Sequence, residues 1–283
     1  MGRRNSRGSR TPIPSVCEVF VKNPEINIRG LTRRFAQATA VDHIDLTVCE
    51  GDIFGLLGAN GAGKTTVIKM LTTLLGPSAG SATVAGFDIV SQAHEVRRRI
   101  GYVPQMLSAD GALTGYENLL LSARLYGVAE QRTRIEEALA FMGLSEYAGR
   151  LVKTYSGGMV RRLEIAQSML HRPAVLFLDE PTIGLDPVAR RAVWVHLKEL
   201  NKDYHITILL TTHDMEEADN LCNDVAVMHT GQIAAHGSPE ALKARVGKQA
   251  TLEDVFTRFS GELEETGRLR DTAETRSSAR HRG

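Results

Sequence analysis

Apolar and polar positions follow two different periods along the chain, and the order of these periods predicts the fold class. Short apolar runs rich in Val, Ile and Leu are typical of buried strands, whereas longer segments between them show the spacing of amphipathic helices. Because strands and helices alternate, we expect an α/β fold with a largely parallel sheet. The predicted strands are Ile26–Leu31, Ile44–Val48, Ile53–Leu57, Gly101–Val103, Val175–Leu178, Thr207–Thr211 and Val225–His229.

The segment from about residue 107 to residue 173 differs from its flanks because its pattern is helical throughout. Apolar side chains recur there at i, i+3, i+4 and i+7, which indicates two helices with one buried face each. We therefore expect an α-helical subdomain inserted into the α/β core. The residues on these two faces are Ile135, Ala138, Leu139 and Met142, followed by Met159, Leu163, Ala166 and Leu170.

Composition and charge restrict the partners that this chain can have. With 283 residues, 42% hydrophobic and 24% charged, it resembles ordinary folded proteins in composition. Its 34 basic and 33 acidic side chains give a net charge of +1, so bulk charge would not hold it to nucleic acid, and we expect no such partner. We find no apolar run long enough to span a membrane and no apolar segment behind the basic N-terminus, which favours a cytoplasmic location.

The two ends of the sequence differ in composition from the part between them. Residues 1–25 are basic and rich in Ser, Gly and Pro, and residues 261–283 are polar, so we predict two flexible tails around a folded domain at residues 26–260. The three cysteines, Cys17, Cys49 and Cys222, are widely spaced. This spacing favours reduced thiols over a disulfide or zinc framework.

A glycine-rich loop predicts phosphate binding. Residues Gly58–Thr65 fit the pattern G-x-x-x-x-G-K-[ST] between a predicted strand and a predicted helix. Glycines let the backbone curl tightly, so that its N–H groups and the helix N-terminus point at phosphate oxygens. Lys64 would reach the β- and γ-phosphates, and the Thr65 hydroxyl would bind Mg²⁺. The alternative is a chance glycine-rich turn, which the flanking strand and helix disfavour.

Two carboxylates follow a second buried strand. Asp179 and Glu180 come directly after the apolar run Ala174–Leu178, and such positions project into the ligand crevice of a parallel sheet. Asp179 is suited to hold Mg²⁺, and Glu180 to polarise an attacking water. The alternative for this segment alone is a solvated acidic turn before Pro181.

Ser156, Gly157 and Gly158 begin a helix predicted to run to about His171, and they form a second phosphate-sized group of exposed N–H donors. A plain helix N-cap is the alternative for these residues alone. One ATP does not need two such sites in one chain. Ser156 lies 23 residues before Asp179 (179 − 156), and His213 lies 34 after it (213 − 179).

In this order, the motifs resemble those of an ATP-binding cassette (ABC) ATPase over residues 26–260. The resemblance implies a P-loop NTPase (RecA-like) core with an antiparallel β subdomain and the inserted helical subdomain, which carries the family signature. The signature departs from Leu-Ser-Gly-Gly-Gln at both ends, where this chain has Tyr155 and Met159. Its serine and glycines remain, so phosphate contact is still implied.

The resemblance also implies roles for individual residues. Catalysis would involve Lys64, Gln105 in the Q-loop, Glu180 and the switch histidine His213. Mg²⁺ would be bound by Thr65, Gln105 and Asp179, and Asp186 in the D-loop would link two ATP sites across a dimer. ATP would be contacted by Phe35, Gly58, Asn60, Gly61, Ala62, Gly63, Lys64, Thr65, Thr66, Ser156, Gly157 and Gly158. Phe35 would stack on adenine, with a core aromatic as the alternative.

Three segments, Tyr155–Met159, Asp110–Asn118 and Thr251–Phe256, resemble ATPases of type 2 ABC exporters of the daunorubicin-resistance or multidrug type. This implies an ATP hydrolase on the inner face of the membrane. Two copies would form a head-to-tail ATP sandwich and drive a separate integral membrane permease that exports a drug, antibiotic, lipid or polysaccharide. We interpret the basic runs Arg97–Arg99 and Arg161-Arg162 as solvated helix faces, with permease contact as the alternative.

Two other functions are compatible with a P-loop. A soluble ABC ATPase acting on nucleic acid or ribosomes usually carries a coiled coil, a zinc module or a second cassette, and we find none of these in the sequence. A regulatory module that binds nucleotide without turnover is disfavoured because Glu180 is intact.

Overall fold

The computed structural model describes residues 23–36 and 38–261, and it contains the expected parallel sheet. The six-stranded sheet has the order β10-β9-β3-β8-β7-β6, in which only β10 runs antiparallel to its neighbour. Its strands are β3 (Ile53–Leu57), β6 (Ile100–Val103), β7 (Val175–Asp179), β8 (Thr207–Thr212), β9 (Asp224–His229) and β10 (Gln232–Gly237). The predicted α/β class is therefore confirmed.

A second, antiparallel sheet packs beside the first, as the family resemblance implied. Its order is β2-β1-β4-β5, with β1 (Pro24–Phe35), β2 (Ala38–Cys49), β4 (Ala79–Val84) and β5 (Phe87–Asp88). The strand predictions missed β4, β5 and β10. β4 reads Ala-Gly-Ser-Ala-Thr-Val and β10 reads Gln-Ile-Ala-Ala-His-Gly, so small and polar residues replace the branched apolar run on which a strand prediction depends.

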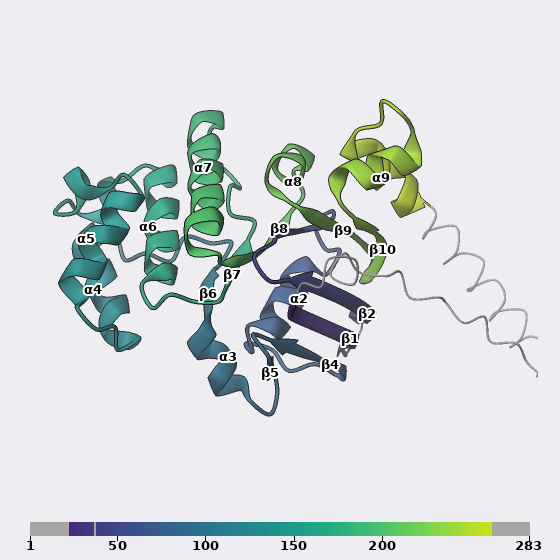
Figure 1. The fold of residues 1–283 in the computed structure, drawn as a ribbon, viewed down its shortest axis with the longest axis horizontal. Helices are drawn as coiled ribbons and strands as arrows, with labels where there is room; N and C mark the ends of the chain where they lie inside the picture. Colours follow the sequence, from purple (N-terminus) through teal and green to yellow (C-terminus); the bar gives the residue numbers. More distant parts are fainter. Residues whose placement is uncertain (1–22, 37, 262–283) are drawn as a thin grey trace, which may run out of the picture.

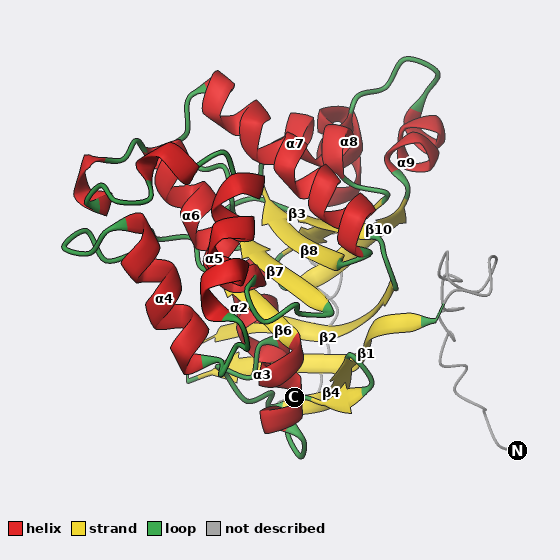
Figure 2. Ribbon diagram, turned by 60° about the vertical axis from the view of Figure 1, so that its left-hand side comes forward, coloured by secondary structure: helices red, strands yellow, loops and turns green. Residues whose placement is uncertain are grey.

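Helices cover both faces of the six-stranded sheet (Figures 1 and 2). All five residues of β3 are buried, and they alternate between two clusters. Phe54 and Leu56 pack with α2 (Lys64–Leu71) and the antiparallel sheet, whereas Ile53 and Leu57 share a cluster with α7 (Pro187–Tyr204) and α8 (Met215–Leu221). Such two-sided burial is typical of parallel strands.

The helical subdomain lies at one end of the sheet, at the left of Figure 1. It consists of α4 (Gly115–Leu125), α5 (Gln131–Phe141) and α6 (Gly157–Met169), with two 3₁₀ turns at Ser145–Tyr147 and Val152–Thr154. The eight apolar residues predicted to share helical faces all belong to, or pack against, one cluster, which confirms the periodicity. The segment is not helical throughout, because residues 107–114 and the links between helices are turns and loops.

The remaining helices within residues 23–36 and 38–261 are α3 (Ala93–Arg99), α9 (Pro239–Val246) and a helix at residues 252–261. Strand β1 begins at Pro24, inside the first predicted tail, and residue 261 is helical; the rest of both predicted tails lies outside the described residues. Within the described ranges, no helix is long and apolar enough to cross a membrane.

Two local predictions were wrong. Arg161 is not on a solvated helix face, because its side chain is among the largest fully buried ones, and its neighbour Arg162 donates to the Met142 carbonyl oxygen. Cys49 is disulfide-bonded, whereas Cys222 is a buried free thiol as expected. Cys17 lies outside the described residues.

Candidate functional site

A cavity of about 320 Å³ lies where β3 and β7 end and α2 begins. It brings the glycine-rich loop, the residue after β7 and the segment after β6 together. The lining residues are Ala40, Asn60, Gly61, Ala62, Gly63, Lys64, Thr65, Thr66, Gln105 and Glu180. The sequence predicted all of them except Ala40. This residue lies near the start of β2 and belongs to no motif.

The glycine-rich loop has a conformation that depends on its glycines. Gly61 and Gly63 have positive φ values of 82° and 106°. A Cβ on Gly63 would lie 2.4 Å from the carbonyl oxygen of Ala40, so a side chain there would clash with the backbone of β2. Gly63 provides no side-chain cap to α2, which leaves the N–H groups of the first turn available to an anion.

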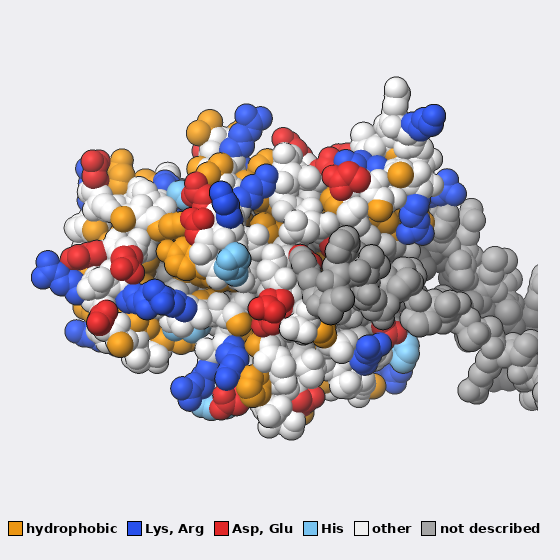
Figure 3. All heavy atoms as spheres, viewed as in Figure 1, with side chains coloured by type: hydrophobic (Ala, Val, Ile, Leu, Met, Phe, Trp, Pro, Cys, Tyr) orange, Lys and Arg blue, Asp and Glu red, His pale blue; other side chains and the backbone are white. Residues whose placement is uncertain are grey.

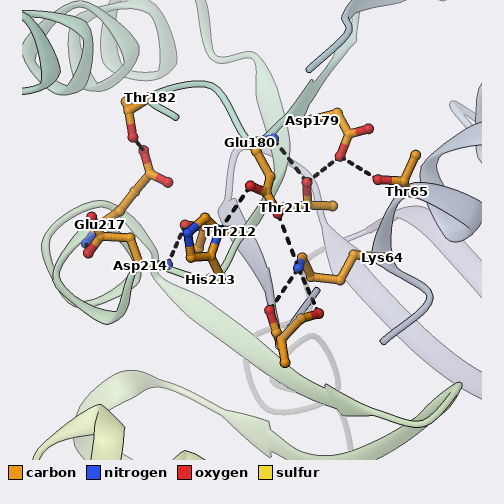
Figure 4. Close-up of polar contacts among 12 residues, drawn as sticks. Lys64, Thr65, Asp179, Glu180, Thr182, Thr211, Thr212, His213, Asp214 and Glu217 are labelled. Carbon is orange, nitrogen blue, oxygen red and sulfur yellow. Dashed lines mark hydrogen bonds and ion pairs between the residues drawn. The ribbon is translucent and has the colours of Figure 1, made fainter. Parts of the chain in front are cut away.

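Lys64 links the loop to the carboxylates (Figure 4). Its ammonium group donates to the carbonyl oxygens of Gly58 at 2.7 Å and Ala59 at 3.1 Å. It also forms an ion pair with the Glu180 carboxylate at 3.2 Å, and both side chains are almost fully buried. The charge of Lys64 is therefore aimed into the cavity and neutralised there by Glu180.

Asp179 accepts hydrogen bonds from two hydroxyl groups that belong to different elements (Figure 4). Thr65 Oγ1, in the first turn of α2, donates to Asp179 Oδ1 at 3.0 Å, and Thr211 Oγ1, on β8, donates to the same oxygen at 2.6 Å. Thr211 Oγ1 also accepts from the backbone N–H of Glu180 at 3.0 Å. The sequence predicted Thr211 only as the last residue of a strand, and no pattern indicated its contact with Asp179.

Glu180 is fixed on both sides and has an unusual backbone conformation. One carboxylate oxygen pairs with Lys64, and the other lies 2.9 Å from His213 Nδ1. Its φ is 48°, in the left-handed region that non-glycine residues rarely adopt. Such conformations persist where the surroundings enforce them, and they are concentrated at functional sites. The His213 ring remains half exposed.

Burial shifts two pKa values around this edge of the sheet. Burial, followed by the negative charge of Asp179, raises the pKa of Tyr102 to about 12, which keeps this phenol neutral. Burial likewise raises the pKa of Glu217, although Thr182 and Trp194 both donate hydrogen bonds to its carboxylate. Glu217 thus connects α8 to the turn after Glu180 (Figure 4) and, through Trp194, to α7.

Several predicted site residues lie outside the cavity. Phe35 is 48% exposed and packs against the Arg33 guanidinium, so the alternative of a core aromatic is wrong. Ser156 caps α6 by accepting from the Met159 N–H, and neither it nor the two glycines after it line the cavity. Asp186 caps α7, accepting from the N–H groups of two residues in its first turn.

Comparison with known proteins agrees with this geometry. The ABC transporter family matches residues 41–183. The daunorubicin/doxorubicin resistance ATP-binding protein DrrA of Streptomyces peucetius is 45% identical over 84% of this chain and 73% of its own length. Nod factor export ATP-binding protein I of Ralstonia nicotianae is 43% identical over 77% of this chain and 68% of its own.

Solved structures show the same fold. An ATP-binding subunit of an ABC transporter superposes with a TM-score of 0.74 at 27% identity, covering 83% of this chain and 99% of that one. The ADP conformation of MJ1267, an ATP-binding cassette of an ABC transporter, gives a TM-score of 0.72 at 25% identity, covering 82% of this chain and 98% of that one. The chain therefore belongs to the ABC transporter family. Within it, the protein is an ATP-binding subunit that hydrolyses ATP.

Proposed function

We propose that the cavity binds and hydrolyses Mg²⁺-ATP and that this subunit thereby drives a separate membrane permease. One observation carries the proposal: a phosphate-binding loop and the Glu180 carboxylate line the same cavity, with Lys64 and Glu180 in contact at 3.2 Å. A positively charged group for the phosphates and a carboxylate for the attacking water are the two parts that phosphoryl transfer to water requires.

Thr65 and Asp179 fit a Mg²⁺ ion. Their side-chain oxygens are 3.0 Å apart at the cavity edge, and Gln105 adds an amide to the same cavity. Mg²⁺ prefers oxygen ligands and is usually held by one or two protein groups, with waters and substrate phosphates completing its shell. When bound, the ion would neutralise charge on the β- and γ-phosphates.

Glu180 is proposed as the general base. As a water oxygen attacks the γ-phosphorus, Glu180 accepts a proton from that water, and the bond to the leaving ADP oxygen breaks. Phosphate oxygens would compete with Glu180 for the Lys64 ammonium and so free the carboxylate for the water. His213, at 2.9 Å from Glu180, would then orient it, and Gln105 would contact the water or the metal.

A second copy of the chain is proposed to complete the site. Ser156, Gly157 and Gly158 form the N-terminus of α6 but do not line this cavity, so they are available to the ATP of another subunit. Asp186 would connect the two sites of this head-to-tail dimer, and Phe35 would stack on the adenine from the exposed end of β1.

The names of the relatives support an exporter. DrrA is named for daunorubicin and doxorubicin resistance, and the Nod factor protein is named for export. A mouse phospholipid-transporting ATPase, ABCA3, is also 42% identical over 87% of this chain, although the match covers only 14% of that protein. We therefore propose export of a drug, antibiotic, lipid or polysaccharide through a type 2 permease, with the subunit held at the inner face of the cell membrane.

The alternative, action on nucleic acid or ribosomes, has less support. Acidic and basic side chains are interspersed over the face seen in Figure 3, rather than gathered into one basic stripe as on nucleic-acid-binding surfaces. Isolation of the complex from native membranes would distinguish the two functions, because only the transport function predicts an integral membrane partner.

The catalytic role of Glu180 is tested by Glu180→Gln. We expect ATP hydrolysis to fall by about 100-fold or more, because the amide cannot accept the proton, while the affinity for ATP stays within about threefold of wild type. Glu216→Gln is the matched control, since Glu216 is exposed in the first turn of α8. Hydrolysis at the wild-type rate in Glu180→Gln would remove this residue from its role.

A further inference from the structure

Arg161 is a buried cation in the helix that begins with the signature residues. It lies in the second turn of α6 and is only 1% exposed. Its guanidinium donates to two consecutive carbonyl oxygens, those of Pro104 at 2.7 Å and Gln105 at 2.8 Å. A planar fork with several N–H donors can satisfy both oxygens at once, which an ammonium group on a lysine cannot do with the same geometry.

Glu164, one turn further along α6, completes this arrangement. One of its oxygens pairs with the Arg161 guanidinium at 3.1 Å, and both side chains are almost fully buried. Its other oxygen accepts from the backbone N–H and the hydroxyl of Ser108 and, at 3.2 Å, from the Ala109 N–H. The pair therefore holds the segment 104–109 at both of its ends.

The segment held in this way faces both the cavity and the solvent. Gln105 lines the ATP cavity, whereas Met106 and Leu107 between the anchored ends are 82% and 51% exposed. The same helix that anchors the segment begins at Ser156, outside that cavity. A rigid connection through Arg161 and Glu164 would therefore tie the position of Gln105 to the position of the α6 N-terminus.

We propose that Arg161 and Glu164 are positioning residues for ATP hydrolysis, which fix the backbone of Gln105 to α6 so that both move as one body. The proposal rests on the proposed function of this cavity. Burying an ion pair is costly, and an apolar pair of similar volume is often as stable. The specific use of the pair is therefore to fix geometry, because it satisfies buried backbone groups of a segment that has no regular structure of its own.

The experiment compares Arg161→Met, Arg161→Lys and Gln105→Ala with wild type in the full-length chain, measuring kcat and KM for ATP and the unfolding temperature. We expect Arg161→Met to lower kcat by about 10- to 100-fold with KM within about threefold, because a displaced group costs rate more than binding. Arg161→Lys should recover only part of kcat. Arg162→Met is the control, because Arg162 lies on α6 but donates to the Met142 carbonyl oxygen instead.

A double variant separates positioning from mere stability. If Arg161 acts through Gln105, Arg161→Met should lower kcat no further once Gln105→Ala is present. Additive losses would overturn the proposal, as would a normal kcat in Arg161→Met with only a lower unfolding temperature. A normal kcat in Gln105→Ala beside a low one in Arg161→Met would overturn it too, and would also remove Gln105 from the proposed function.

Hydrogen exchange tests the same idea without measuring catalysis, so it distinguishes a failure of positioning from a failure of the proposed role of the cavity. In a Glu180→Gln background, ATP should protect the amides of residues 58–66 and 104–109. With Arg161→Met added, protection at 58–66 should persist while protection at 104–109 is lost. Equal protection of both segments with and without Arg161→Met would show that the buried pair does not position the Gln105 segment.

Discussion

At the scale of single residues, the hydroxyl of Thr211 organises both carboxylates of the site. It donates to Asp179 and accepts from the backbone N–H of Glu180, so it controls the direction of one side chain and the backbone of the next. Thr211 is fully buried on the central strand β8, where its own position is fixed by the sheet. The orientation of the proposed metal ligand therefore depends on a residue that does not itself line the cavity of the candidate site.

Thr211→Val tests this dependence. Valine keeps the shape and the strand preference of threonine but removes the hydroxyl. Asp179 should therefore lose orientation, and the Glu180 N–H should keep only the backbone carbonyl oxygen of residue 211 as its acceptor. We expect ATPase activity to fall by about 10-fold or more and the Mg²⁺ concentration required for half-maximal activity to rise. Thr83→Val, on β4 of the other sheet, is the control. Unchanged Mg²⁺ dependence in Thr211→Val would contradict this role.

Residue types and spacing were sufficient to predict most of the site but not its supporting contacts. Lys64, Asp179 and Glu180 were predicted because loops and strand ends have sequence patterns with a known geometry. Arg161 was predicted to be solvated, since nothing in an arginine pair indicates that one guanidinium is buried against a distant loop. Such contacts depend on tertiary structure between segments more than 50 residues apart, as for Arg161 and Gln105.

At the scale of secondary-structure elements, the contact between α6 and α7 depends on Gly158. A Cβ on Gly158 would lie 2.7 Å from the Cβ of Ala189 in α7, which is closer than real contacts allow. A Cβ on its neighbour Gly157 would have Leu185 as its nearest neighbour, at 3.4 Å. One signature glycine is thus required by helix packing in the chain itself, whereas the other is not.

These two glycines should therefore respond differently to alanine. Gly158→Ala should lower the free energy of unfolding by roughly 1–3 kcal/mol, because α6 and α7 must separate to fit the methyl group. Gly157→Ala should leave stability within about 1 kcal/mol of wild type, since alanine is a better helix former. Urea unfolding of both variants measures the difference. Equal stability of the two variants would contradict this prediction, because it would mean that α7 shifts to fit the methyl group at residue 158 without a cost in free energy.

A histidine at the end of α6 gives this region a pH dependence. His171 stacks on Tyr126 with ring centroids 4.0 Å apart and bonds to the Ile100 carbonyl oxygen. Burial lowers its pKa, an effect only partly offset by that hydrogen bond. The unfolded chain therefore binds the proton more readily, so the stability contributed by the neutral ring is complete above about pH 6.5 and declines below it.

His171→Phe should weaken this pH dependence while keeping the stacking on Tyr126. We expect the urea midpoint of the wild type to fall between pH 7.5 and pH 5.5, and the midpoint of the variant to fall less. Some dependence should remain, because burial and the nearby charge of Arg162 also lower the pKa of His196. An identical decline in wild type and variant would show that His171 does not contribute to it.

The elements themselves were predictable to the extent that each has its own pattern. The buried faces of α5 and α6 follow from their apolar spacing, and β3 and β7 follow from continuous apolar runs. Strands β4 and β10 have neither signal, and they form because neighbouring strands offer them hydrogen-bond partners. Their position is a property of the assembled sheets rather than of their own residues.

At the scale of the whole molecule, the two helix N-termini proposed to bind phosphate belong to one chain but not to one cavity. Lys64 begins α2 at the cavity, and Ser156 caps α6 outside it. A single triphosphate can use both only if they come from different chains. The proposed head-to-tail dimer then contains two composite sites, each with Lys64 from one copy and Ser156 from the other.

Mixing two inactive variants tests this arrangement. Lys64→Met removes the phosphate-binding cation, and Ser156→Arg blocks the α6 N-terminus, so each variant alone should be inactive. A one-to-one mixture should recover roughly a quarter of wild-type ATPase activity, since half of the dimers are mixed and each mixed dimer has one intact site of two. The control is a double variant that carries both Lys64→Met and Ser156→Arg in one chain. Its mixture with either single variant contains no intact site and should stay inactive. Absence of recovery in the first mixture, with both variants folded, would contradict sites shared between two copies.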